Sequence, residues 1–65
     1  MIKAEFIGRE VLITTLDGLK YVGKVVEVNG PDDSEYNECE IGINFAGGIR
    51  MFRECEINSI SIVKG

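Results

Sequence analysis

An Asp17-Gly18 pair stands between two runs that are rich in β-branched and apolar side chains. The first run covers residues 9–16, REVLITTL, and the second covers residues 19–29, LKYVGKVVEVN. Val, Ile and Thr suit a pleated strand, and Asp-Gly supplies the positive φ angles of a type I′ two-residue turn. The pattern therefore predicts an antiparallel hairpin with Asp17-Gly18 as its turn.

The second run is apolar on both of its faces. A glycine inside a strand is typical of a barrel corner or a bulge, and Gly23 lies inside this run. We therefore expect the strand to bend at Gly23 and to contribute to two halves of a sheet. The apolar residues of its two faces are Leu19, Tyr21 and Val25 on one, and Val22, Val26 and Val28 on the other.

Three further β-like runs follow, each bounded by turn residues. The run CEIGINF alternates apolar and polar residues, which indicates a strand with one buried face. The segment RECE predicts a single 3₁₀ turn before the last strand. Residues 3–8 fit either a short helical turn or a leading strand. The predicted strands cover residues 39–45, 49–52 and 57–63, with a turn at 46–48 and the 3₁₀ turn at 53–56.

Residues 29–38, NGPDDSEYNE, form the longest predicted loop. Gly, Pro, Asn, Asp and Ser are typical loop residues. The segment carries four acidic residues and no basic one. Their spacing does not match an EF-hand, so a solvated acidic loop is favoured over a calcium site. The four acidic residues are Asp32, Asp33, Glu35 and Glu38.

Five short strands in 65 residues predict a single all-β domain over residues 1–65. We expect a strongly bent, antiparallel, five-stranded small barrel, closed or nearly closed, because closure removes free strand edges. The side chains expected in its core are Val11, Ile13, Val22, Val26, Ile41, Ile43, Phe45, Met51, Ile57, Ile60 and Ile62.

The residue types argue against an enzyme. The chain has no His, so its serines and its two cysteines have no evident base to activate them. Cys39 and Cys55 lack the CxxC spacing of a zinc site. We expect reduced thiols and no metal or other cofactor, with a disulfide between Cys39 and Cys55 left open.

Charge and hydropathy restrict the partners. The apolar runs are too short to span a bilayer, and the start, MIKAEF, lacks the features of a secretion signal. We therefore expect a cytoplasmic protein without a membrane partner. Seven basic residues face eleven acidic ones, a net charge of −4, so any nucleic-acid site must be local.

Two stretches resemble the motifs of the Sm-like family, which includes the Hfq proteins. VLITTL, the Asp-Gly turn and LKYVGKVVEVN resemble the first motif, and IRMFRECEINSISIV resembles the second. The resemblance covers residues 9–63. Src-homology-3-like barrels, such as Tudor domains, share the strand order, and YVGKVVEVNG is similar to the KOW element.

The Sm-like resemblance implies a ring in which the fourth strand of one subunit pairs with the fifth strand of the next. It also implies single-stranded RNA bound around the pore, with contacts near Asn29 and Arg53. This chain departs from the pattern at both places. Asn29 leads into the acidic loop without a Met-Asn pair, and Arg53-Glu54 replaces the family's Arg-Gly or Lys-His.

Two functions follow from these observations. The first is a ring-forming protein that binds single-stranded RNA through Asn29, Arg50, Arg53 and Tyr36, since arginine holds phosphate and aromatic rings stack on bases. The alternative is a barrel that binds protein or only itself, in which the arginines pair with nearby glutamates. We expect the chain to associate with itself by strand pairing, with a monomeric closed barrel as the alternative, and we expect no small-molecule substrate.

Overall fold

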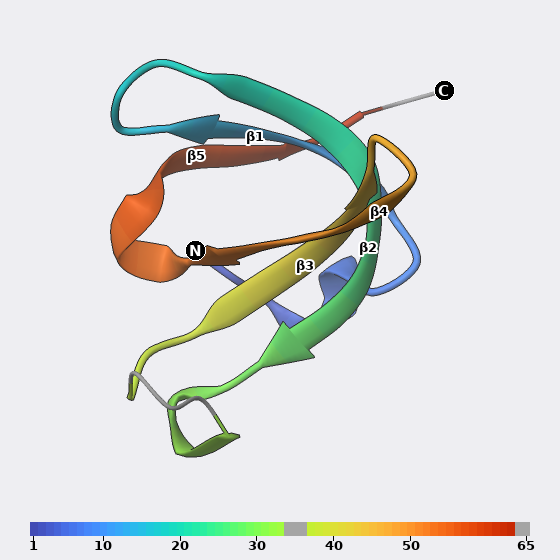
Figure 1. The fold of residues 1–65 in the computed structure, drawn as a ribbon. Coiled ribbons are helices and arrows are strands. Elements are labelled where there is room, and N and C mark those ends of the chain that lie inside the picture. The colour runs from blue at the N-terminus through green and yellow to red at the C-terminus, as the bar shows by residue number, and fades with distance from the viewer. Residues whose placement is uncertain (34–36, 64–65) are drawn as a thin grey trace.

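The computed structural model describes residues 1–33 and 37–63, which form one curved antiparallel sheet (Figure 1). The order of its strands is β4-β3-β2-β1-β5. The predicted all-β fold with five antiparallel strands is confirmed. The strands are β1 (Glu10–Thr15), β2 (Lys20–Asn29), β3 (Glu40–Phe45), β4 (Gly48–Arg53) and β5 (Ile57–Ile62), and the 3₁₀ turns are η1 (Ala4–Phe6), η2 (Pro31–Asp33) and η3 (Glu54–Glu56).

Strand β2 belongs to both halves of the sheet. Its residues up to Lys24 pair with β1, and its residues from Val25 onward pair with β3. Gly23 stands beside this change of partner, where an added Cβ would overlap the carbonyl oxygen of Asn44. Only a glycine allows so close an approach of another backbone. The predicted use of one strand in two halves is confirmed.

The turn between β1 and β2 differs from the prediction. A type I′ turn needs positive φ at both central residues, yet of the Asp-Gly pair only Gly18 has one, at 87°. The N–H of Gly18 donates to the carbonyl of Thr15 at 3.0 Å, and Thr15 pairs with Leu19 at 2.9 Å. The loop therefore has three residues. The Thr15 hydroxyl holds it, since it donates to Asp17 and accepts from the N–H of Leu19 at 3.1 Å.

The type I′ pattern lies instead between β3 and β4. Phe45 pairs with Gly48, and the two residues between them, Ala46 and Gly47, have φ angles of 52° and 81°. Two consecutive positive φ angles define the primed hairpin turn, which Asn and Gly favour. Ala46 occupies the first of these positions despite its Cβ.

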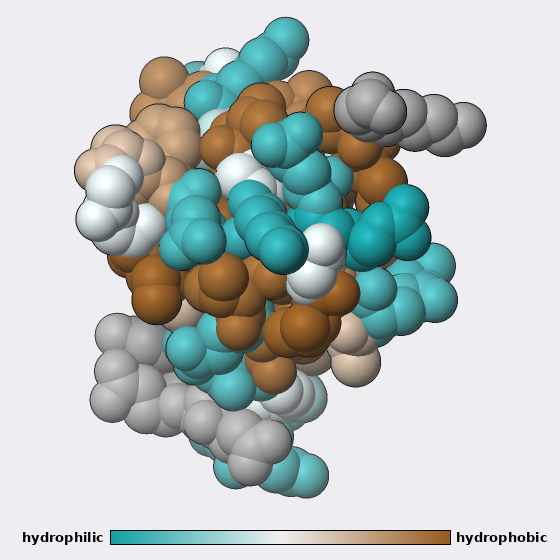
Figure 2. Space-filling view, turned by 90° about the vertical axis from the view of Figure 1, so that its right-hand side faces the viewer, coloured by the Kyte–Doolittle hydropathy of each residue, from teal (hydrophilic) through white to brown (hydrophobic). Residues whose placement is uncertain are grey.

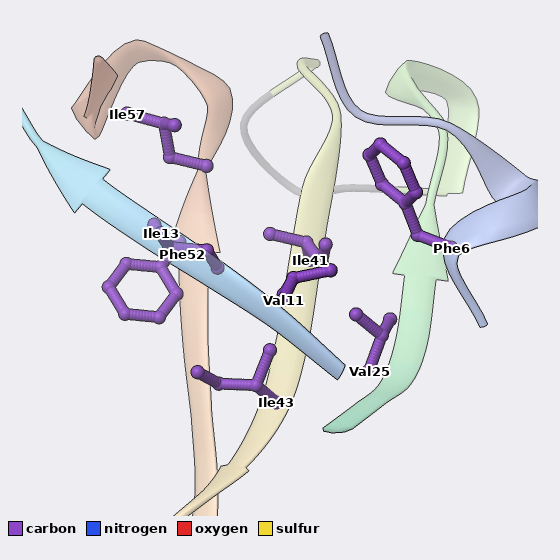
Figure 3. Close-up of a cluster of buried hydrophobic side chains, with 8 residues drawn as sticks. All are labelled: Phe6, Val11, Ile13, Val25, Ile41, Ile43, Phe52 and Ile57. Carbon is purple, nitrogen blue, oxygen red and sulfur yellow. The ribbon is translucent and has the colours of Figure 1, made fainter. Parts of the chain in front are cut away.

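Eight buried side chains form the core (Figure 3). Five of them were predicted, and Ile60 packs against the cluster. Phe6 was missed because residues 3–8 left two alternatives open; the structure forms a 3₁₀ turn there and buries this ring. The core residues are Phe6, Val11, Ile13, Val25, Ile41, Ile43, Phe52 and Ile57.

Five predicted core residues are wrong, and the register of β2 explains two of them. Gly23 pairs with Val11 on the buried face, so Val22, opposite Leu12, lies on the other face. Val26 falls where the register with β3 shifts, so it is the extra residue of a β-bulge. The five residues, exposed between 38% and 46%, are Val22, Val26, Phe45, Met51 and Ile62.

The other three errors arise in β3, β4 and β5. Phe52 pairs with Ile41 on the buried face, which places Met51 opposite Gly42 on the outer face. Phe45 and Ile62 share the inner face of the sheet. Each stands near the end of its strand, where part of the side chain meets solvent.

The sheet is not closed into a barrel, so the predicted barrel, closed or nearly closed, is not confirmed. In the described part of the chain, β4 pairs only with β3 and β5 pairs only with β1. Between them, η3 redirects the chain from one end of the sheet to the other (Figure 1). Both end strands therefore keep one free edge. Over the described residues, no helix combines the length and apolar character needed to cross a membrane.

Candidate nucleic-acid interface

The four residues predicted to contact RNA do not form one site. Arg50 pairs with Ile43 and shares the inner face of the sheet. Asn29 and Arg53 flank Glu40 from the two neighbouring strands and lie in one row on the outer face. Tyr36 lies outside the described residues.

Carboxylates occupy the row of Asn29 and Arg53. The amide of Asn29 donates to Glu27 at 2.7 Å and to Glu40 at 3.4 Å. Nε of Arg53 lies 3.6 Å from Oε1 of Glu56, and the Arg53 backbone N–H donates to the same oxygen at 2.9 Å. A phosphate placed here would meet several negative charges at short range.

Arg50 has a different environment, built from aromatic rings. Its Cζ lies 5.1 Å from the ring centre of Tyr21 and 5.5 Å from that of Phe52. Tyr21 meets both Phe52 and Phe45 edge to face, with centres 5.0 and 5.1 Å apart. Such cation–π and edge-to-face contacts are favourable. The Arg50 side chain therefore starts on β4 and lies over a ring of β4 and a ring of β2, and the latter ring also contacts Phe45 of β3.

The guanidinium of Arg50 is open to a ligand. Its side chain is exposed. Among the side chains that the structure describes, residues 1–32 and 37–63, no carboxylate lies at ion-pair distance from Arg50. The guanidinium carries five N–H donors in a fixed planar fork. It therefore keeps donors for an incoming acceptor.

A pocket of about 260 Å³ opens beside Arg50. The β1–β2 loop, β4 and η3 line it, and the N–H of Leu16 ties the loop to η3 through the carbonyl of Glu56 at 3.0 Å. Tyr21 and Phe52 also line it, so the rings that hold Arg50 belong to the pocket. Its remaining lining residues are Thr15, Leu16, Asp17, Leu19 and Glu56.

The loop residues of this pocket were not predicted from the sequence. Leu16 and Leu19, which flank the Asp-Gly pair, are 68% and 52% exposed. Two large apolar residues around a hairpin turn are unusual, since such loops are ordinarily polar. The segment LDGL therefore carried a signal that could have identified this edge of the pocket.

The outer surface also exposes apolar side chains. Figure 2 shows one such face, with hydrophobic residues above and below a band of hydrophilic ones. On the outer face of the sheet, a Cβ added at Gly42 would meet Met51 Sδ at 2.5 Å and Ile49 Cγ2 at 3.3 Å. A shallow hollow at the β3–β4 turn, residues 44–49, is lined without a charged side chain.

The two cysteines lie on adjacent segments. The N–H of Glu54 donates to the carbonyl of Cys39 at 2.9 Å, and the N–H of Cys55 donates to Glu38 at 3.0 Å. The backbone bond lowers the pKa of Glu38, and a side-chain hydrogen bond between the Cys55 thiol and Glu38 raises the pKa of that thiol. Both thiols are free. The described residues contain no group of three or more potential metal ligands.

Comparison of the chain with protein-family models, with curated proteins and with solved structures finds no match.

Proposed function

We propose that this chain is a non-enzymatic protein that binds single-stranded RNA at the pocket beside Arg50. The observation that carries the proposal is the arginine itself. Its guanidinium is held over Tyr21 and Phe52 with no carboxylate partner in the described chain. Single-stranded RNA is recognised by aromatic rings and arginine planes that stack on unpaired bases.

The fold that fits this function is a small barrel of the Sm-like kind, completed by neighbouring copies. The free edges of β4 and β5 support it, since an exposed strand edge is a template for another strand. The resemblance of residues 9–63 to the Sm-like motifs supports the same arrangement. Assembly would also repeat the Arg50 pocket around the particle.

The acidic character of the chain restricts which interactions can bind RNA. With a net charge of −4, long-range attraction to RNA is absent, and binding depends on local contacts. Arg50 then matters more than the outer arginine, Arg53, which lies beside Glu56.

Fluorescence anisotropy with labelled oligo-U and oligo-A at two salt concentrations tests the proposal. We expect binding that strengthens at low salt, because phosphate contacts release counterions. Arg50→Gln should weaken it about tenfold or more. Arg53→Gln removes the same charge at the other site and should change it little. Absence of binding at low salt, or equal losses in both variants, would refute the proposal.

A second candidate function is self-association without RNA. The free edges of β4 and β5 favour it, together with exposed apolar side chains such as Ile49, which is 61% exposed. Light scattering on RNA-free protein measures it. A mass of several chains combined with no RNA binding at low salt would establish this function in place of the first.

A further inference from the structure

We infer that the pocket beside Arg50 selects guanine over the other bases of single-stranded RNA. The inference rests on the proposed function and specifies the ligand of the same site. It is carried by the polar groups that line the pocket: the guanidinium of Arg50, and the carboxylates of Asp17 and Glu56 on the loop and on η3.

Guanine is the base whose hydrogen-bonding groups match this set. Its Watson–Crick edge presents two adjacent donors, N1–H and N2–H₂, and an ionised carboxylate is a pure acceptor with two oxygens. Its other edge presents the acceptors O6 and N7, which arginine reads with two parallel N–H bonds. Arg50 and Asp17 therefore supply the partners for both edges.

The other bases match less well. Adenine and cytosine each place a ring-nitrogen acceptor next to their single amino group, and uracil flanks its one N–H with two carbonyl oxygens. Against a carboxylate, each of these bases brings at least one acceptor toward another acceptor. An unpaired or repelled polar group in a binding site costs affinity.

Asp17 is positioned for this role. Its Oδ1 accepts the hydroxyl proton of Thr15, which fixes the side chain at the base of the loop. A carboxylate has about four acceptor sites, so this one bond leaves Asp17 able to accept from a ligand. Asp17 is exposed, and the Leu16 N–H bond to Glu56 keeps its loop beside η3.

The apolar lining suits one planar ring system. Leu16, Leu19, Tyr21 and Phe52 surround the polar groups. The volume of about 260 Å³ falls just below the range of roughly 300–1,000 Å³ that drug-sized ligands occupy. A single base, with its sugar and phosphate outside, fits that size.

The test compares labelled heptanucleotides of uridine that carry one central guanosine, adenosine, uridine or inosine. Anisotropy at low salt should show the guanosine strand binding about tenfold more tightly than the adenosine and uridine strands. Inosine lacks the N2 amino group, so its strand should bind with intermediate affinity.

Asp17→Asn should reduce the guanosine preference, measured as the ratio of guanosine to uridine affinity, from about tenfold to about twofold or less. Asp32→Asn is the matched control, because it removes one exposed carboxylate from η2, away from the pocket. It should leave the ratio of guanosine to uridine binding unchanged. Thermal unfolding of both variants checks that they fold.

Binding of all four strands with equal affinity would overturn this inference and leave the proposed function standing. Equal loss of preference in Asp17→Asn and Asp32→Asn would overturn it as well. Absence of binding to any strand at low salt would overturn the proposed function itself, so the two failures are distinguishable.

Discussion

Ala46 adopts a backbone conformation that a residue with a Cβ atom disfavours. It adopts a φ of 52° in the β3–β4 turn, a conformation that costs an L-residue with a Cβ roughly 1–2 kcal/mol. Asn tolerates this region better and is favoured in primed turns. We expect Ala46→Asn to raise the free energy of unfolding by about 0.5–1 kcal/mol, measured by denaturant titration.

The control for that substitution is Ala4→Asn. Ala4 is exposed in η1 and is not among the residues with positive φ. The Ala4→Asn substitution should give no gain in the free energy of unfolding. A loss of stability in Ala46→Asn would contradict the assignment of the turn.

Gly23 lies where the backbone of another strand approaches closely. Because an added Cβ would overlap the Asn44 carbonyl, Gly23→Ala must push β2 away from β3. We expect a loss of about 1–3 kcal/mol in the free energy of unfolding. Gly30→Ala is the matched control, since a Cβ there meets nothing within 4 Å. Similar losses in both variants would refute the explanation.

Glu38 makes part of the stability depend on pH. The Cys55 N–H lowers the pKa of Glu38 in the folded state, so the folded chain favours the carboxylate. The stability that ionised Glu38 contributes is present above the pKa of Glu38 in the unfolded chain. It is lost as the pH falls through the lower pKa of Glu38 in the folded chain. We expect Glu38→Gln to reduce the loss of stability on acidification, as followed by thermal unfolding between pH 7 and pH 3. An unchanged pH profile would contradict this role.

At the scale of the element, two neighbouring residues of β4 show which face of that strand is buried. Phe52 is 2% exposed and Met51 is 41% exposed. Phe52→Ala should therefore cost about 3–5 kcal/mol, whereas Met51→Ala should cost about 1 kcal/mol or less. Denaturant titration of both variants measures the difference. A larger loss for Met51 would reverse the assigned faces.

The strands themselves were predictable from the sequence. Alternation over residues 39–45 and the β-branched runs indicated their type, and each predicted strand agrees with the observed one to within one residue at either end. These are local signals, and local signals determine the existence and type of an element best. The 3₁₀ turn at η3 was predictable for the same reason.

The features that the sequence could not predict are those set by the pairing of strands that lie far apart in the chain. The faces of β2 change at the bulge around Val26, and a one-residue shift moves every later side chain to the opposite face. The pocket could not be predicted for the same reason, because Leu16 and Glu56 lie far apart in the sequence and meet only in the folded chain. Arg50 was predicted as a contact residue, but its separation from Asn29 and Arg53 follows from the register of β4.

At the scale of the whole molecule, a pocket with a single arginine in an acidic chain predicts a shallow salt dependence for RNA binding, because the slope counts the phosphates that are neutralised. The slope of log K against log salt is about −0.7 for each phosphate neutralised on a single strand. With Arg50 as the one arginine of each pocket, we expect a slope no steeper than about −0.7 per chain. Anisotropy titrations from low to moderate salt measure it. A slope several times steeper would indicate a broader basic surface than Arg50 provides.

The hydrogen bond between Leu16 and Glu56 has a thermodynamic consequence. The pocket exists only when two segments far apart in the sequence have met, so an unfolded chain has no equivalent binding site. Any molecule that occupies the pocket therefore draws the population toward the native state, by an amount that grows with ligand concentration. For so small a domain, an occupied pocket would act as a structural support, much as a bound metal supports other short chains.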